Sequence, residues 1–510
     1  MSKQIRNLGV FLAVCYVALF LQVNRLTVFE AEALQDKPQN TRAIERDFSS
    51  PRGDIVTADG VVLAESVPSD DRFELQRTYP DATAELFAHI TGYFAFTLGT
   101  TGVEREYNGY LNGEDIGFDL DRIGDLFVDR DVVGDVILSV RADVQQVARD
   151  ALGGNPGSVV ALDPRNGELL AMWSSATFDP NLLATHDFDA AQAQSEAYNL
   201  DPAKPTVSRA YREREFPGST FKVVTATAGI ERGGVTEDSP DYPVTDSYQP
   251  PGGGRPIPNF GGSTCGGTLF VILQESCNTS FAQMGVDTGG QELYEVSQGF
   301  GFDRDVPFDL PRGEQSNFPE EIVDDPPLVA QASIGQNEVQ ATPLQMALVA
   351  AAVANEGVIM EPHVMREVRD DQGNEVAEYD DDDFSQPMSP ATAGTLREAM
   401  VSVVTDGTAN RLDDGLDGFE VGGKTGTAQL GIEPPQSHAW IIGFAGPPGE
   451  TPHVAVAVIV EAQPGASEQT GGQVAAPIAA AVMQAALAPP GDSGQGGQDG
   501  GEDGDSGDGG

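Results

Sequence analysis

The chain has 510 residues, too many for one small hydrophobic core, and this length predicts several domains. Its 29 lysine and arginine residues stand against 79 aspartate and glutamate residues, and a formal net charge of −50 argues against a nucleic-acid-binding protein. Hydrophobic residues make up 40% of the chain, so packed cores are expected and disorder along the whole chain is not.

Lysine is scarce, and arginine supplies the rest of the positive charge. The five lysines are Lys3, Lys37, Lys204, Lys222 and Lys424. A lysine in this chain is therefore expected to have a specific local role, and two of the five lie in short motifs described below. The acidic residues are spread along the chain, a pattern that favours solubility and that we interpret as an adaptation to salt.

The N-terminus predicts a membrane anchor. Lys3 and Arg6 precede an apolar run from Leu8 to Leu21. We predict a cytoplasmic stub and a transmembrane anchor over residues 1–29, with the rest of this single-pass protein on the extracytoplasmic side of the cell membrane. The alternative is a cleaved signal peptide, since residues 31–33 read Ala-Glu-Ala, a small-x-small pattern.

The next part of the chain, residues 30–138, is polar and rich in turns. Residues 52–64 predict a hairpin with a turn at Gly60. Ser139 is expected to cap a helix that runs to Leu152, and residues 158–173 predict two strands joined by a turn.

Later patterns predict a covered sheet. Thr342 to Gln345 form a capping box that opens an apolar helix ending at Asn355. Residues 439–444 and 454–460 predict strands buried on both faces, and residues 473–487 predict a closing helix. We expect an α/β fold in which helices cover both faces of an antiparallel sheet. Residues 488–510 form a Gly- and Asp-rich tail that we expect to be disordered.

The first chemical motif is Ser219-x-x-Lys222, directly after Pro217-Gly218. A helix from Ser219 to Ile230 would place the hydroxyl and the amine on one face. A lysine that loses its proton through burial can activate a serine as a nucleophile. The five histidines are scattered, which argues against a zinc site or a Ser–His–Asp triad, and no metal or cofactor motif is present.

Two further motifs can complete such a site. Ser276 and Asn278, two residues apart, can relay a proton and hold a substrate carbonyl. The purely structural alternative is that the tripeptide at residues 276–278 caps a helix. Lys424, Thr425, Gly426 and Thr427 predict an edge strand that a ligand can approach closely at the glycine. The lysine and the two hydroxyls suit a carboxylate.

In this order the three motifs resemble those of a class B penicillin-binding protein, of the PBPA type found in actinobacteria. The resemblance covers nearly all of the chain to about residue 487. It extends to segments outside the three motifs, at residues 52–53, 59–60, 102–113, 178–182, 333–336, 342–344 and 438–440. No glycosyltransferase stretch precedes the N-terminal segment, which favours class B over class A.

The resemblance implies a D,D-transpeptidase that cross-links peptidoglycan stem peptides and is acylated by β-lactam antibiotics. Ser219 would be the nucleophile and Lys222 its base, with Ser276 as proton shuttle and Asn278 holding the donor peptide. Substrate carboxylate recognition would fall to Lys424, Thr425 and Thr427 around Gly426, and the oxyanion hole to the backbone amides of Ser219 and Thr427.

The resemblance also implies the domain organisation and the partners. Residues 30–138 would be a non-catalytic α+β domain of a dimerisation or pedestal kind, and residues 139–487 a transpeptidase domain. Peptidoglycan stem peptides would be the substrate, the plasma membrane would hold the anchor, and a SEDS-type glycan polymerase is a candidate partner. No cofactor is expected.

The cysteines fit this interpretation. Cys15 lies in the apolar run and is expected to act as a small hydrophobic residue. Cys277 lies between Ser276 and Asn278, so a disulfide to Cys265 would fix the loop that presents both groups. The alternative is two separate buried thiols.

Other functions share parts of this pattern. A D,D-carboxypeptidase or a β-lactamase of the same fold would need a carboxylate that activates water, and the sequence singles out none. A β-lactam sensor or a non-catalytic divisome scaffold is a further alternative. The scaffold predicts that growth survives the Ser219→Ala change.

Overall fold

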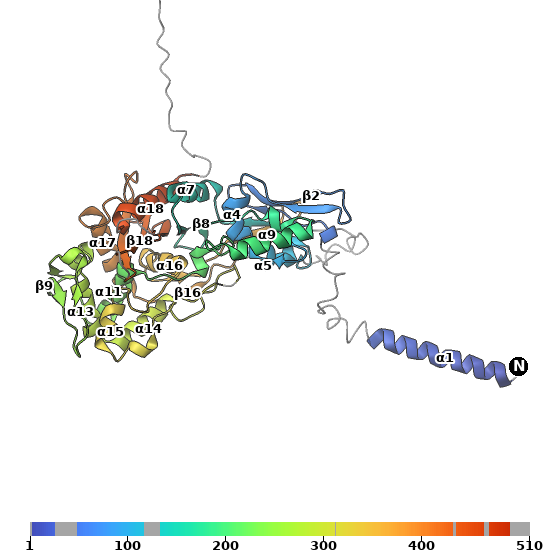
Figure 1. The fold of residues 1–510 in the computed structure, drawn as a ribbon, viewed down its shortest axis with the longest axis horizontal. Helices are drawn as coiled ribbons and strands as arrows, with labels where there is room; N and C mark the ends of the chain where they lie inside the picture. Colours follow the sequence, from blue (N-terminus) through green and yellow to red (C-terminus); the bar gives the residue numbers. More distant parts are fainter. Residues whose placement is uncertain are drawn as a thin grey trace, which may run out of the picture.

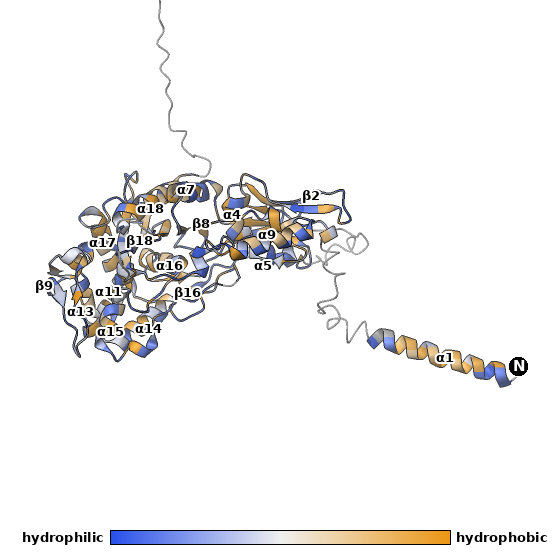
Figure 2. Cartoon of the chain, in the orientation of Figure 1, coloured by the Kyte–Doolittle hydropathy of each residue, from blue (hydrophilic) through white to orange (hydrophobic). Residues whose placement is uncertain are grey.

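The computed structural model describes residues 3–25, 48–116, 133–311, 313–431, 435–463 and 469–489. Helix α1 (Lys3–Asn24) stands apart from the folded body and is apolar along most of its length (Figures 1 and 2). Among the described residues it is the one helix long and apolar enough to cross a membrane. The small-x-small pattern at residues 31–33 lies outside the described residues, as does the tail from residue 490.

The N-terminal part of the body is built on a six-stranded sheet. Its order is β15 (Glu375–Glu378), β14 (Met365–Arg369), β6 (Asp135–Leu138), β1 (Ile55–Val56), β2 (Val62–Pro68) and β3 (Leu75–Thr78). Strands β1 and β2 form the predicted hairpin, with Ile55 opposite Ala64. The sheet also takes β14 and β15 from much later in the chain, so its residues come from both sides of the predicted boundary at residue 138.

Short helices and a buried ion cluster complete this part. The helices are α4 (Ala84–Thr91), α5 (Gly102–Glu106) and α6 (Asn108–Leu111), beside the pair β4 (Phe94–Ala95) and β5 (Gly99–Thr100). Glu104 accepts from Arg52 at 2.7 Å and from Arg77 at 2.6 Å. Burial would raise the pKa of Glu104, but the two guanidinium groups lower it below its usual value. The cluster ties the segment around Arg52 to α5.

The second sheet has five antiparallel strands. Their order is β17 (Glu420–Gln429), β18 (Ser437–Gly446), β19 (Val454–Val460), β7 (Gly157–Leu162) and β8 (Leu169–Ser175). Every residue of β18 and β19 is buried, as their continuous apolar runs predict. Helices α7 (Ala142–Leu152) and α18 (Gly471–Leu487) cover one face and α16 (Pro343–Ala354) the other (Figure 1). The predicted covered antiparallel sheet is therefore present.

A helical layer packs beside β17, which is one of the two edge strands of this sheet. Its helices are α11 (Lys222–Glu231), α12 (Leu269–Gln274), α13 (Asn278–Thr288), α14 (Gly290–Phe300), α15 (Pro326–Ala332) and α17 (Pro390–Thr405). The remaining elements are α8 (Asn181–Ala184), α9 (Phe188–Leu200), α10 (Arg209–Arg212), the 3₁₀ helices η3 (Gly218–Phe221), η4 (Phe260–Gly262) and η5 (Glu320–Ile322), and the short strands β9 (Tyr242–Thr245), β10 (Ser247–Tyr248), β11 (Ile257–Pro258), β12 (Cys265–Gly267), β13 (Ile359–Met360) and β16 (Asp383–Ser385).

The two predicted helix caps differ in outcome. Thr342 caps α16 as expected, because its hydroxyl accepts from the backbone N–H of Gln345 at 3.1 Å. Ser139 does not cap α7, whose N-cap is Arg141. The Ser139 hydroxyl instead donates to the carbonyl of Leu169 at 2.8 Å, so it links the end of β6 to β8.

Candidate active site

The first motif lies on a tight turn between α10 and α11. Ser219 belongs to η3, and α11 begins only at Lys222. The predicted α-helix from Ser219 to Ile230 is therefore wrong in its first turn. Residues i and i+3 eclipse each other in a 3₁₀ helix, so the tighter turn still places Ser219 and Lys222 on one side.

Two glycines allow this turn to form. Gly218 has a φ of 53°, a conformation that favours glycine. Its backbone N–H donates to the carbonyl of Gly335 at 3.0 Å. A Cβ on Gly335 would lie 2.1 Å from the carbonyl oxygen of Gly218, so a larger residue would push the two segments apart. The segment around Gly335 therefore supports Ser219 from behind.

Lys222 is fully buried and hydrogen-bonded to the second motif. Its Nζ donates to the Ser276 carbonyl at 2.7 Å, to Asn278 Oδ1 at 2.7 Å and to Ser276 Oγ at 3.3 Å. Burial lowers the pKa of Lys222 well below its usual value, and the charge of Lys424 lowers it further. Among the described residues, no hydrogen bond joins Lys222 to Ser219.

Ser276 lies between two lysines at the entrance to α13. Its φ of 57° is uncommon for a residue other than glycine. Its Oγ accepts from Lys424 Nζ at 2.8 Å as well as from Lys222. Because both lysines donate, the hydroxyl proton of Ser276 is free to point elsewhere. Asn278 begins α13 and donates to the carbonyl of Pro258 at 3.1 Å, which fixes its amide.

The third motif lies on β17, which is an edge strand as predicted. Lys424 is fully buried, and burial lowers its pKa to about 7. Thr425 and Thr408 share a hydrogen bond of 2.7 Å between their hydroxyls. A Cβ on Gly426 would lie 2.9 Å from a side-chain carbon of Thr220, so the glycine lets β17 approach the turn that carries Ser219.

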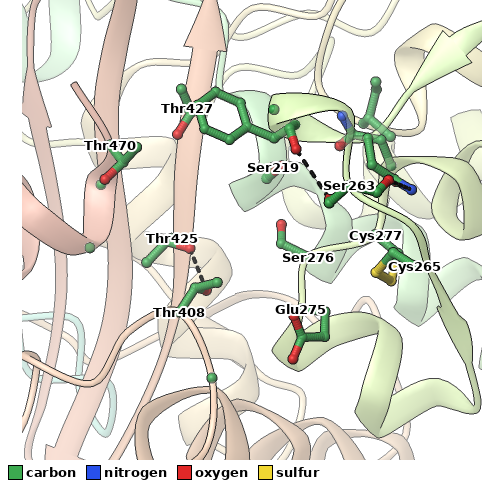
Figure 3. A pocket seen from close by; sticks show the side chains of 18 of the residues that line it. Ser219, Ser263, Cys265, Glu275, Ser276, Cys277, Thr408, Thr425, Thr427 and Thr470 are labelled. Atoms are coloured by element: carbon green, nitrogen blue, oxygen red, sulfur yellow. Dashed lines mark hydrogen bonds between the residues drawn. A yellow bond between two sulfur atoms is a disulfide. The ribbon is translucent and has the colours of Figure 1, made fainter. Parts of the chain in front are cut away.

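These groups meet at one cleft of about 650 Å³. Figure 3 shows Thr425 and Thr427 on one strand, facing Ser219 and Ser276 across an opening. Asn278 also lines this cleft, while Lys222 and Lys424 lie buried behind Ser276. The structure thus brings the three predicted motifs together.

Several lining residues were not predicted. They come from η4, from the end of α12, from the loop after α17 and from the N-cap of α18, and they include Phe260, Glu275, Thr408, Asn410, Arg411 and Thr470. The clearest sequence signal was the pair Gly471-Gly472, because a Cβ on Gly471 would lie 1.8 Å from the carbonyl oxygen of Trp440. The other residues lie in loops without a local pattern.

The predicted disulfide between Cys265 and Cys277 is confirmed, with the two Cα atoms 5.5 Å apart. It joins β12 to the residue between Ser276 and Asn278, and both cysteines are buried. Cys15 is a free, exposed cysteine on α1.

Comparison with known families gives two matches along the chain. The penicillin-binding protein transpeptidase domain matches residues 157–484, and the penicillin-binding protein A dimerisation domain matches residues 52–137. The chain is 38% identical to the peptidoglycan D,D-transpeptidase PbpA of Mycolicibacterium smegmatis over 505 residues, which are 96% of this chain and 99% of that protein. It is 35% identical to PbpA of Mycobacterium tuberculosis over 506 residues, with the same coverage.

Solved structures agree with the sequence matches. Penicillin-binding protein A of M. tuberculosis, as a ceftriaxone acyl-enzyme complex, superposes with a TM-score of 0.78 at 34% identity over 87% of this chain and all of that chain. Its penicillin G acyl-enzyme complex gives a TM-score of 0.75 at 34% identity, over 86% of this chain and all of that chain. The predicted family and fold are confirmed. The chain belongs to the penicillin-binding proteins, among the PBPA-type peptidoglycan D,D-transpeptidases.

Proposed function

We propose that this cleft cross-links peptidoglycan stem peptides through an acyl-enzyme on Ser219. Ser219 Oγ attacks the carbonyl carbon of the penultimate D-alanine of a donor peptide. The bond to the terminal D-alanine breaks, and the released amine takes up a proton. The amine of an acceptor peptide then attacks the ester, forms the cross-link and frees the serine. A β-lactam acylates the same oxygen.

The environment of Lys222 is the observation that carries this proposal. Its ammonium would be buried without a carboxylate among its hydrogen-bond partners, which favours the neutral amine that a base requires. Its three hydrogen bonds to positions 276 and 278 use all three donors of the ammonium. Loss of one proton leaves donors for the two bonds of 2.7 Å and frees the lone pair. We infer that it takes the proton of Ser219 once a substrate carbonyl draws the serine into the cleft, because catalytic hydrogen bonds often tighten only in the complex.

Ser276 would return the proton to the leaving amine. Its oxygen accepts from Lys222 and Lys424, so its own proton can be directed toward the cleft and replaced from a lysine. Asn278 is held by Lys222 and by the carbonyl of Pro258, which suits a residue that positions the donor peptide.

The strand opposite would bind the charged ends of the substrate. Lys424, Thr425 and Thr427 offer an ammonium and two hydroxyls for the terminal carboxylate. The oxyanion hole would use the backbone amides of Ser219 and Thr427. The close approach of their segments supports it, because a Cβ on Gly218 would lie 2.9 Å from the carbonyl oxygen of Thr427.

Intact mass after exposure to benzylpenicillin tests these roles. We expect a stable adduct on the wild-type chain, none on Ser219→Ala, and strongly slowed labelling of Lys222→Ala and Ser276→Ala. The matched control is Lys204→Ala, because Lys204 is an exposed lysine paired with Glu213 at 2.9 Å outside the cleft. Normal labelling of Lys222→Ala would remove the lysine from its role as base.

The same assay separates the hydrolytic alternatives. Water attack on the acyl-enzyme needs a carboxylate base, and Glu275 is the one carboxylate among the described residues that line the cleft. Steady turnover of penicillin that Glu275→Gln abolishes would identify a β-lactamase. Release of D-alanine without cross-linked product would identify a carboxypeptidase.

We further propose that α1 anchors the chain with Lys3 and Arg6 in the cytoplasm and the cleft outside. The positive charges before α1 and the disulfide beside the cleft both support this orientation. Residues 30–138 and 139–487 remain our proposed domains, and a SEDS-type glycan polymerase our proposed partner. Protease accessibility in spheroplasts tests the topology, and copurification with a tagged polymerase tests the partner.

A further inference from the structure

A second cavity, of about 280 Å³, lies where the two parts of the body meet. Residues of α4 and α5 line one side of it, and residues of α9 and α10 line the other. Figure 1 shows α4, α5 and α9 close together in the part of the body that also holds β2. The side chains of Phe178 and Leu183 form an apolar wall of the cavity. This cavity is separate from the cleft that holds Ser219.

The lining of this cavity is basic, although the chain as a whole is strongly acidic. The lining contains Arg105, Arg212 and His89 but, among the described residues, no aspartate or glutamate. The whole chain carries 79 acidic residues against 29 basic ones, so a lining without a carboxylate is unexpected. Arg105 is exposed and Arg212 is half-buried, so solvent and small solutes can reach both guanidinium groups.

The two arginines also lack the partners that other arginines of this protein have. Within the described ranges, neither Arg105 nor Arg212 makes an ion pair or a side-chain hydrogen bond. Arg209, on the same helix as Arg212, pairs with Glu461 at 2.7 Å and Glu213 at 3.6 Å. A guanidinium group has five N–H donors in a fork that matches two oxygens of a carboxylate or a phosphate, so an unpaired arginine beside a cavity favours an oxyanion as ligand.

Neutral hydrogen-bonding groups surround the two charges. Ser195, Asn199 and Thr101 line the same cavity. His89 is buried, and its Nε2 contacts the carbonyl of Pro205 at 2.9 Å. Burial, aided by the charges of Arg209 and Arg212, lowers the pKa of His89 to about 4, so the imidazole is neutral near pH 7.

We propose that this interdomain cavity is a binding site for a small oxyanion, held between Arg105 of α5 and Arg212 of α10. The cavity has room for a phosphate or for the carboxylate end of one amino-acid residue. A bound anion would join the two parts of the body close to the segment that leads from α10 to Ser219.

Binding is tested on the full chain in detergent, acylated first with benzylpenicillin so that the catalytic cleft is blocked. The probes are inorganic phosphate and N-acetyl-D-alanine, with N-acetyl-D-alaninamide as the uncharged control. Calorimetry at constant ionic strength follows wild type, Arg105→Gln, Arg212→Gln and the double variant. Arg232→Gln is the matched control, because Arg232 is exposed and lies outside the cavity.

We expect at least one anion to bind wild type and Arg232→Gln equally, with about tenfold weaker binding in each single cavity variant and none in the double variant. Tighter binding of N-acetyl-D-alanine would identify a peptide carboxylate as the ligand, and tighter binding of phosphate a phosphate group. Absence of binding to wild type, or equal binding by the double variant, would overturn the proposal. Retained acylation of the variants shows that they fold and that the catalytic cleft is intact.

Discussion

Removal of the Cys265–Cys277 disulfide should weaken the fold by a predictable amount. The two cysteines are 12 positions apart, and opening a loop of this length costs about 3 kcal/mol in the chain-entropy account. For a cooperative unit of about 350 residues, an unfolding entropy of about 2.1 cal/mol/K per residue converts this loss into a fall in Tm of about 4 °C. We expect this shift on reduction and in the Cys265→Ala/Cys277→Ala variant.

The same change should slow acylation without abolishing it. Cys277 sits between Ser276 and Asn278, so the disulfide restrains the loop that presents both groups. The hydrogen bonds from Lys222 to the Ser276 carbonyl and to Asn278 remain after reduction. A misplacement of catalytic groups by about 1 Å can cost about 100-fold in rate, and with these bonds intact we expect about tenfold.

The assay is the second-order rate constant for acylation by benzylpenicillin, measured with and without reductant. Alkylation followed by intact mass verifies that both thiols are free, and Cys15→Ser provides a chain whose other cysteines are unambiguous. An unchanged rate in fully reduced protein would show that the lysines alone position Ser276. An unchanged Tm would refute the account of the loop entropy.

Three further changes test other contacts. Burial lowers the pKa of Lys424 to about 7, so its charge is lost as the pH rises through about 7. Above this pH the rate of acylation by benzylpenicillin should fall relative to the rate with its methyl ester, which lacks the carboxylate. Parallel pH profiles for the two compounds would contradict a contact between Lys424 and the carboxylate. Gly426→Ala would place a Cβ 2.9 Å from a Thr220 carbon, so we expect slower acylation, and an unchanged rate would refute the need for close approach. The half-buried side chain of Asp309 accepts from the Tyr107 hydroxyl at 2.6 Å and from the backbone N–H of Met365 at 2.9 Å. Asp309→Ala should lower the free energy of unfolding in urea by about 3 kcal/mol, whereas a loss below about 1 kcal/mol would mean that water replaces the carboxylate.

Local patterns sufficed where an element depends on its own residues. The hairpin of β1 and β2, the cap of α16 at Thr342 and the buried strands β18 and β19 were all predicted from short stretches. The catalytic motifs were recognisable for a related reason. Ser219 and Lys222 share one turn, and Ser276 and Asn278 share one loop. Residues that act together are therefore close in the sequence and form short, recognisable motifs.

Long-range packing decided the features that were missed. Strand β14 pairs with β6, placing Val368 opposite Val136, and no local pattern near residue 368 indicates that partner. Ser139 could have capped a helix, but its position beneath β8 gives its hydroxyl a carbonyl acceptor instead. The turn at Ser219 tightens to a 3₁₀ helix because it packs on Gly335, more than a hundred positions away.

The choice of lysine at the site follows from its ability to lose a proton. Arginine stays protonated at every accessible pH, so a chain that uses arginine for most of its positive charge still needs lysine where a base is required. Lys222 is fully buried beside the charge of Lys424, and both effects favour its neutral amine. The net charge of −50 acts in the opposite sense, but exposed charges are screened beyond about 10 Å in 0.1 M salt. Burial, together with the neighbouring lysine, therefore governs the protonation of Lys222, and the acidic surface can vary without disabling the base that we propose.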